Sequence, residues 1–128
     1  MISSLRPDFF ADSIYEIDNK WLERNKIRAL IVDVDNTILS RDAVAPHAKL
    51  LEWVVNLRKS GIKLIVVSNN WTARVRKIAE ELGLPLLAPA GKPLGFVFRR
   101  AIEMLGSDRS ETAIIGDQLF TDVLGGRR

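Results

Sequence analysis

The feature of this sequence that most restricts its fold is a regular alternation of apolar runs and amphipathic segments from Ile27 onward. The apolar runs are short and rich in branched residues, which favours buried strands, and apolar residues recur at helical spacing between them. Strands that alternate with helices predict a parallel sheet, covered on both faces and joined by right-handed crossovers. The expected strands are 27–32, 62–67, 84–88 and 112–115, and the expected helices are 46–59, 72–82, 94–105 and 118–124.

Composition excludes several classes of function. The chain has 128 residues, of which 47% are hydrophobic, so it can bury the core of one domain. It has no cysteine, which excludes a disulfide scaffold, a thiolate zinc site and a cysteine nucleophile. The net charge of +3 is small and its basic residues are dispersed, so we expect no nucleic-acid partner. No apolar run of about 18 residues and no signal peptide is present, which favours a cytoplasmic protein.

Polar residues follow each expected strand directly. In an open parallel sheet, ligands bind outside the carboxyl ends of the strands, so these residues are the candidates for a functional site. Along the chain they are Asp33, Asp35 and Thr37, then Ser68 and Asn69, then Lys92, and finally Asp117 and Asp122.

These residues combine carboxylates with a cation and a hydroxyl. Asp33 and Asp35 lie two residues apart, so they point the same way on an extended backbone, and Asp117 joins them from another strand. Three neighbouring carboxylates repel one another unless a cation holds them, and oxygen ligands without nitrogen or sulfur suit Mg²⁺. Ser68 and Lys92 can bind phosphoryl oxygens. The pattern predicts a magnesium-dependent phosphoryl-transfer site.

The order of these motifs resembles the haloacid dehalogenase superfamily. Its finer details are similar to the YqeG-like phosphatases of subfamily IIIA, and the resemblance covers nearly the whole chain. The implied fold class is α/β, a three-layer, doubly wound parallel sheet without a cap domain. The segments that carry the resemblance are Asp33-Val34-Asp35-Asn36-Thr37, Ser68, Lys92 and Gly116-Asp117 with Asp122.

The resemblance implies a mechanism for three of the aspartates. Asp33 would be the nucleophile and form an aspartyl-phosphate. Asp35 would protonate the leaving group and then activate water. Mg²⁺ would be held by the Asp33 and Asp117 carboxylates and by the backbone carbonyl of Asp35.

The same resemblance implies supporting roles for the remaining residues. Ser68, Asn69 and Lys92 would bind the phosphoryl oxygens. Asp122 would orient Lys92 or a metal-bound water, and Thr37 would brace the loop after the first strand.

The spacing of the motifs bears on the substrate. The segments between Thr37 and Ile62 and between Ser68 and Lys92 have room for secondary structure of the core but not for a cap domain. An open site suits a bulky substrate or one presented at a surface. YqeG-like proteins are similar to the mitochondrial phosphatidylglycerophosphate phosphatases, so the resemblance implies a lipid phosphate, with a soluble phosphorylated metabolite as the alternative.

The two ends of the chain depart from the alternation. We divide the chain into an apolar arm, 1–26, and a core, 27–128; the arm is expected to be helical and to cover the sheet, or else to contact a membrane surface or a partner. The resemblance implies the strand order 84–88, 62–67, 27–32, 112–115 and a fifth strand beside 112–115. We expect this sequence to lack the fifth strand, because nothing follows Arg128. Strand 112–115 is therefore expected to be a bare edge unless the arm or a second copy of the chain covers it.

Two other classes of function fit parts of the pattern. A receiver-type signalling domain also clusters aspartates on such a sheet, but its phosphoacceptor would follow the third strand, where this chain has Ala88-Pro89-Ala90. A non-catalytic phosphate-binding or scaffold protein on the same fold is the second alternative. Intact Asp33 and Asp35 favour the enzyme.

Overall fold

The computed structural model describes residues 9–10, 14–33, 48–68, 72–88, 94–115 and 120–123 of the chain. The helices are α1 (Asn19–Arg24), α2 (Ala48–Lys59), α3 (Ala73–Leu82) and α4 (Leu94–Leu105), with short 3-10 turns η2 (Ile14–Glu16) and η3 (Arg109–Glu111). The strands are β1 (Phe9–Phe10), β2 (Ala29–Asp33), β3 (Lys63–Val67), β4 (Leu86–Leu87), β5 (Thr112–Ile115) and β6 (Phe120–Val123).

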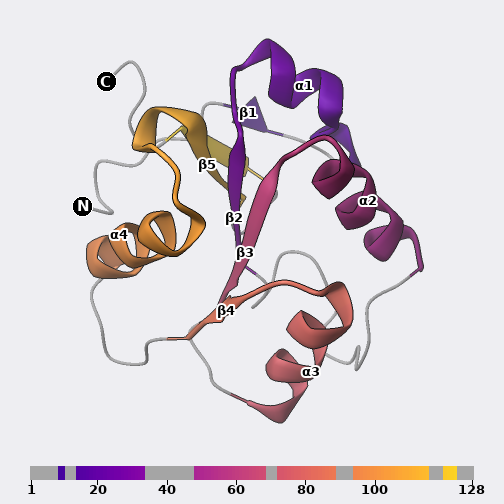
Figure 1. The fold of residues 1–128 in the computed structure, drawn as a ribbon, viewed down its shortest axis with the longest axis vertical. Helices are drawn as coiled ribbons and strands as arrows, with labels where there is room; N and C mark the ends of the chain where they lie inside the picture. The colour runs from indigo at the N-terminus through magenta and orange to yellow at the C-terminus, as the bar shows by residue number, and fades with distance from the viewer. Residues whose placement is uncertain are drawn as a thin grey trace.

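The strands form one sheet in the order β1-β6-β5-β2-β3-β4 (Figure 1). β2 pairs in parallel with β3 on one side and with β5 on the other, and β3 pairs in parallel with β4. The predicted order of the four parallel strands is confirmed. β4 lies at the sheet edge, as Pro85 indicates, because proline cannot donate to a ladder. The carbonyl of Pro85 still accepts from the Val66 amide at 2.9 Å.

The structure corrects the expected end of the sheet. Residues 120–123 form strand β6, not part of a helix, and β6 pairs antiparallel with β5. Because β6 covers β5, the expectation of a bare edge there is wrong. β1 in turn pairs antiparallel with β6. The physical reason is that the unpaired backbone groups of β5 gain hydrogen bonds from a returning strand, which outweighs a weak local helix preference. An antiparallel strand thus lies beside β5, where this sequence was expected to lack a strand.

Helices cover both faces of the sheet. α4 lies on one side, and α2 and α3 lie on the other (Figure 1). Alternate residues of the central strands point to opposite faces. Ile31 and Ile65 belong to the cluster with Val97 of α4, whereas Leu30 and Leu64 belong to the cluster that contains residues of α2 and α3. Both clusters are buried, so the predicted three-layer arrangement is confirmed.

The described part of the N-terminal segment packs against α2. Ile14, Ile17, Trp21 and Leu22 are buried in the same cluster as residues of α2 and α3. The indole Nε1 of Trp53 donates to the carbonyl oxygen of Ile17 at 2.9 Å. These residues are therefore part of the hydrophobic core. Among the described helices, none is long and apolar enough to cross a membrane.

An aromatic contact adds to this packing. The ring of Tyr15 meets that of Trp53 edge-on, with centroids 6.5 Å apart, and the Lys49 ammonium lies 4.5 Å from the centre of the Tyr15 ring. Burial raises the pKa of the Tyr15 phenol. The contact joins the turn that precedes α1 to the first two turns of α2.

We predict that Trp53→Phe lowers the free energy of unfolding by about 2–4 kcal/mol, because it removes indole volume and leaves the Ile17 carbonyl without its donor. The measurement is urea unfolding followed by circular dichroism. Leu51→Ala, at a position on the same helix that is 38% exposed, is the control and should change the value by less than about 0.5 kcal/mol. Equal stability of the Trp53 variant and the wild type would contradict the anchoring role.

Candidate active site at the carboxyl edge of the sheet

Asp33 and Ser68 are brought together by strand register. Asp33 is the last residue of β2, is partly buried, and is paired with Val67 of β3. Ser68 follows Val67 directly, so it lies one step beyond the residue that faces Asp33. Because parallel strands end at the same edge, the two polar residues share the carboxyl edge of the sheet. The register therefore places both residues at the edge where the site was expected, and their roles stay a prediction.

Ser68 is positioned by the backbone of β4. Its amide donates to the carbonyl oxygen of Leu87 at 3.1 Å, which extends the β3–β4 ladder by one residue. The residue is only 1% exposed. A hydroxyl that is buried at a strand end is expected to be hydrogen-bonded, which fixes its orientation better than a surface serine.

Asp122 lies in strand β6 and not in the helix expected over 118–124. It belongs to β6 and is paired with Ile114 of β5, which in turn is paired with Ile31 of β2. The backbone of Asp122 is therefore level with a position two residues before Asp33 and is separated from β2 by one strand. The aromatic and β-branched residues Phe120, Thr121 and Val123 are the strand signal that the helical interpretation passed over.

The remaining predicted site residues lie outside the described part of the chain. The structure therefore places two of the predicted residues, Asp33 and Ser68, at one edge of the sheet, and it gives the backbone position of a third, Asp122. Within the described ranges, no group of three or more His, Cys, Asp or Glu residues could hold a metal ion. The residues outside are Asp35, Thr37, Asn69, Lys92 and Asp117.

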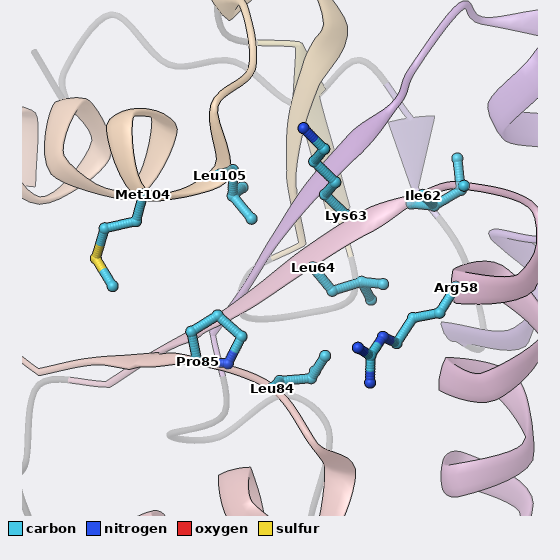
Figure 2. Close-up of a pocket in the computed structure, with 9 residues that line it drawn as sticks. Arg58, Ile62, Lys63, Leu64, Leu84, Pro85, Met104 and Leu105 are labelled. Atoms are coloured by element: carbon cyan, nitrogen blue, oxygen red, sulfur yellow. The ribbon is translucent and has the colours of Figure 1, made fainter.

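A hollow of about 370 Å³ lies at the opposite, amino edge of the sheet (Figure 2). Lys63, the first residue of β3, lines it together with Leu84 and Leu105. Ser68 is five residues further along the same strand direction, a distance of about 16 Å on extended backbone. The hollow is therefore separate from the edge that carries Asp33 and Ser68.

A second feature of the amino edge is that helices end there. The guanidinium Nη1 of Arg58, in the last turn of α2, donates to the carbonyl oxygen of Gly83 at 3.1 Å. Gly83 ends α3 in the left-handed conformation, with φ of 71°. Cations near helix C-termini balance the partial negative charge of the free carbonyls. The basic side chain thus has a structural role at this edge.

Comparison with known proteins agrees with this arrangement. The haloacid dehalogenase-like hydrolase family matches residues 5–128. The YqeG protein of Bacillus subtilis (strain 168), named a probable phosphatase, is 38% identical over 122 residues, which are 95% of this chain and 71% of that protein. The phosphoglycolate phosphatase of Caulobacter vibrioides is 31% identical over 117 residues, and the match covers 83% of this chain but 49% of that protein.

Solved structures share the fold. The cobalt-bound deoxy-D-mannose-octulosonate 8-phosphate phosphatase (YrbI) of Haemophilus influenzae superposes with a TM-score of 0.61 at 21% identity, over 73% of this chain and 60% of that one. The 3-deoxy-D-manno-octulosonate 8-phosphate phosphatase of Yersinia pestis gives 0.61 at 19% identity, over 77% and 59%. The family match and the identity to YqeG together show that this chain belongs to the haloacid dehalogenase-like hydrolases.

Proposed function

We propose that the protein is a Mg²⁺-dependent phosphomonoester hydrolase in which Asp33 is the nucleophile. The observation that carries the proposal is the register between β2 and β3, which sets Asp33 and the buried Ser68 at one edge of the sheet. The family and the phosphatase names of both relatives support hydrolysis of a phosphate ester.

Asp33 and Asp35 would divide the reaction into two balanced steps. A carboxylate oxygen of Asp33 attacks the phosphorus, the ester P–O bond breaks, and the leaving oxygen takes a proton from the Asp35 carboxyl. Asp35 then removes a proton from water, which attacks the phosphorus of the aspartyl-phosphate. The Asp33 carboxylate leaves, and inorganic phosphate is released.

The donor set available to a metal consists of oxygen atoms. The carboxylate of Asp33 stands partly buried at the strand end, and the chain has no cysteine and one histidine, which suits a hard cation. Asp33 and Asp117 would hold Mg²⁺ with their carboxylates, and Asp35 with its backbone carbonyl. The bound ion would neutralise the repulsion between the Asp33 carboxylate and the phosphate dianion.

Ser68, Asn69 and Lys92 are proposed to hold the phosphoryl group that is transferred. The Ser68 hydroxyl and the amide of Asn69 would donate to phosphoryl oxygens, and the Lys92 ammonium would offset their charge. Asp122 would orient Lys92 or a metal-bound water. Thr37 would keep the loop after β2 in place.

The proposed substrate class is a lipid phosphate such as phosphatidylglycerophosphate, reached by a contact of the protein with the cytoplasmic face of a membrane. The support is the short spacing between the motifs, which leaves no room for a cap over the site. Soluble phosphate esters are the alternative, and the name of the Caulobacter relative, a phosphoglycolate phosphatase, favours that class. The assays below separate the two.

We predict that Asp33→Asn lowers kcat for p-nitrophenyl phosphate by about 10³-fold or more, because an amide cannot act as the nucleophile, while Mg²⁺ binding is only weakened. Release of inorganic phosphate and calorimetric Mg²⁺ titration measure the two effects. Asp108→Asn is the matched control, since Asp108 is exposed and its side chain makes no capping hydrogen bond. Full activity of the Asp33 variant would refute the nucleophile assignment.

Chelation should abolish turnover reversibly. After treatment with EDTA and desalting, we expect Mg²⁺ to restore phosphate release, and Ca²⁺ to restore less than about a tenth of it, because Ca²⁺ prefers longer bonds and more ligands than a compact octahedral site provides. Circular dichroism of the chelated protein controls for unfolding. Undiminished turnover without any divalent ion would contradict a metal-dependent reaction.

The substrate class is tested by comparing kcat/KM for phosphatidylglycerophosphate in detergent with kcat/KM for a panel of soluble phosphate esters. We expect the lipid to be hydrolysed with a kcat/KM at least about tenfold higher, since an open site leaves room for its glycerol backbone and acyl chains. The same assay with the Asp33→Asn variant controls for contaminating phosphatases. A higher kcat/KM for a soluble ester would assign the enzyme to that class instead.

A further inference from the structure

A second hollow at the amino edge of the sheet is lined mainly by polar residues. It has a volume of about 330 Å³ and lies between α1, the start of β2 and the turn that follows α2. It meets the hollow of Figure 2 at Gly61 and Ile62, which line both. We call it the α1 hollow, and the residues that line it and bear on a ligand are Asn19, Glu23, Ile27, Arg28, Ser60 and Ile62.

The side-chain oxygen of Asn19 has no partner within the fold. This Oδ1 atom is buried, and no hydrogen bond satisfies it. A buried acceptor without a donor costs free energy, so such atoms are rare in folded proteins. The last torsion of an asparagine side chain is soft, and a small rotation turns Oδ1 toward the hollow that the residue lines. The α1 hollow therefore offers an acceptor that a ligand with an N–H donor would satisfy.

Charges of opposite sign line the same hollow without pairing. Glu23 lies one helical turn after Asn19 on α1, so the two residues share a face of that helix. Arg28 immediately precedes β2. Glu23 and Arg28 are both exposed, and neither takes part in a salt bridge within the described ranges. A ligand that carries both signs of charge would satisfy the two residues at once.

The apolar part of the lining bears on the rest of the ligand. Ile27 is 2% exposed and belongs to the larger core cluster, and the partly buried Ile62 packs against that cluster. A small hydrocarbon group that lies against these two residues loses contact with water, which favours binding. Ser60 adds a hydroxyl that can donate or accept. The lining thus combines a free acceptor, two opposite charges and an apolar side.

We propose that the α1 hollow binds a free α-amino acid with an apolar side chain. The ammonium would donate to Oδ1 of Asn19 and to the carboxylate of Glu23, and the carboxylate of the ligand would accept from the guanidinium of Arg28. The side chain of the ligand would lie against Ile27 and Ile62. A free amino acid carries both charges on one carbon, which an internal residue of a peptide does not. A volume of about 330 Å³ leaves room for such a molecule.

The α1 hollow is separate from the candidate active site. Arg28 precedes Asp33 by five residues along β2, a distance of about 16 Å on extended backbone. The amino acid would therefore not take the place of a phosphate ester, and the inference does not rest on the proposed function. The bound ligand would join α1 to the first residues of β2, so we expect it to stabilise the packing of the N-terminal segment.

Calorimetry with L-leucine and two analogues tests each charge of the ligand. 4-Methylpentanoate is leucine without its ammonium, and 3-methylbutylamine is leucine without its carboxylate. We expect leucine to bind the full chain with a Kd of about 1 mM or tighter, and each analogue to bind at least about tenfold more weakly, because each lacks one charge-assisted contact. Leucine at about ten times its Kd should also raise Tm by about 3–6 °C.

Variants of the lining assign each contact. Glu23→Gln should weaken leucine binding by about tenfold but 4-methylpentanoate binding by less than about twofold, because only leucine carries the ammonium. Arg28→Gln should weaken leucine by about tenfold and spare 3-methylbutylamine. Glu52→Gln and Arg24→Gln are the matched controls, since both residues are exposed and neither lines the hollow. The controls should change each Kd by less than about twofold.

Asn19→Ala separates a binding role from a structural one. Because Oδ1 has no hydrogen bond for folding to lose, we expect the variant without leucine to have a Tm no more than about 1 °C below that of the wild type. The Kd of leucine should rise by about threefold or more. A lower Tm with an unchanged Kd would show that the amide serves the fold alone, and the proposed contact would be wrong.

Two results would overturn the inference as a whole. One is the absence of leucine binding at about 10 mM, and the other is an equal effect of the Glu23 and Arg28 variants on leucine and both analogues. Release of inorganic phosphate by the wild type is measured separately. Failure of the proposed function therefore leaves this inference standing, and failure of leucine binding leaves the proposed function untouched.

Discussion

The central strand β2 is the element on which the rest of this structure depends. Residues Ala29 to Val32 are at most 3% exposed, so helices must cover both faces of the strand. Its backbone groups are equally removed from water, and the parallel strands β3 and β5 satisfy them on the two sides. The same register that satisfies the backbone sets Asp33 beside the end of β3. The candidate active site is thus a direct consequence of how the sheet is paired.

The edges of the sheet are closed by different means. On one side, β4 is the edge strand and its pairing with β3 is short. Pro85, which precedes β4, contributes only its carbonyl to this pairing. On the other side β6 returns antiparallel along β5, and β1 adds to β6, so two segments far apart in sequence complete the sheet. Trp53 joins the N-terminal segment to α2 by its hydrogen bond to Ile17. The N-terminal segment therefore depends on partners that come later in the chain.

The charged residues of the helices are placed differently at the two edges of the sheet. At the amino edge, Arg58 and Lys59 lie at the end of α2, where cations complement the carbonyls of a helix end. At the carboxyl edge, α3 begins with cations that its own dipole disfavours. The placement of charge relative to the helix dipole therefore differs between α2 and α3.

The sequence by itself determined the parallel sheet and the positions of Asp33 and Ser68 at strand ends, because these follow from local periodicity. The order of the strands was expected only from the family resemblance. The sequence also carried the motifs from which the family was identified. Only the tertiary structure decided that 120–123 is a strand and that Phe9–Phe10 pairs with it, since an edge strand is stabilised by partners that no local pattern specifies. The same holds for the hydrogen bond from Trp53 to Ile17, because residues distant in sequence meet only once the elements have packed against one another.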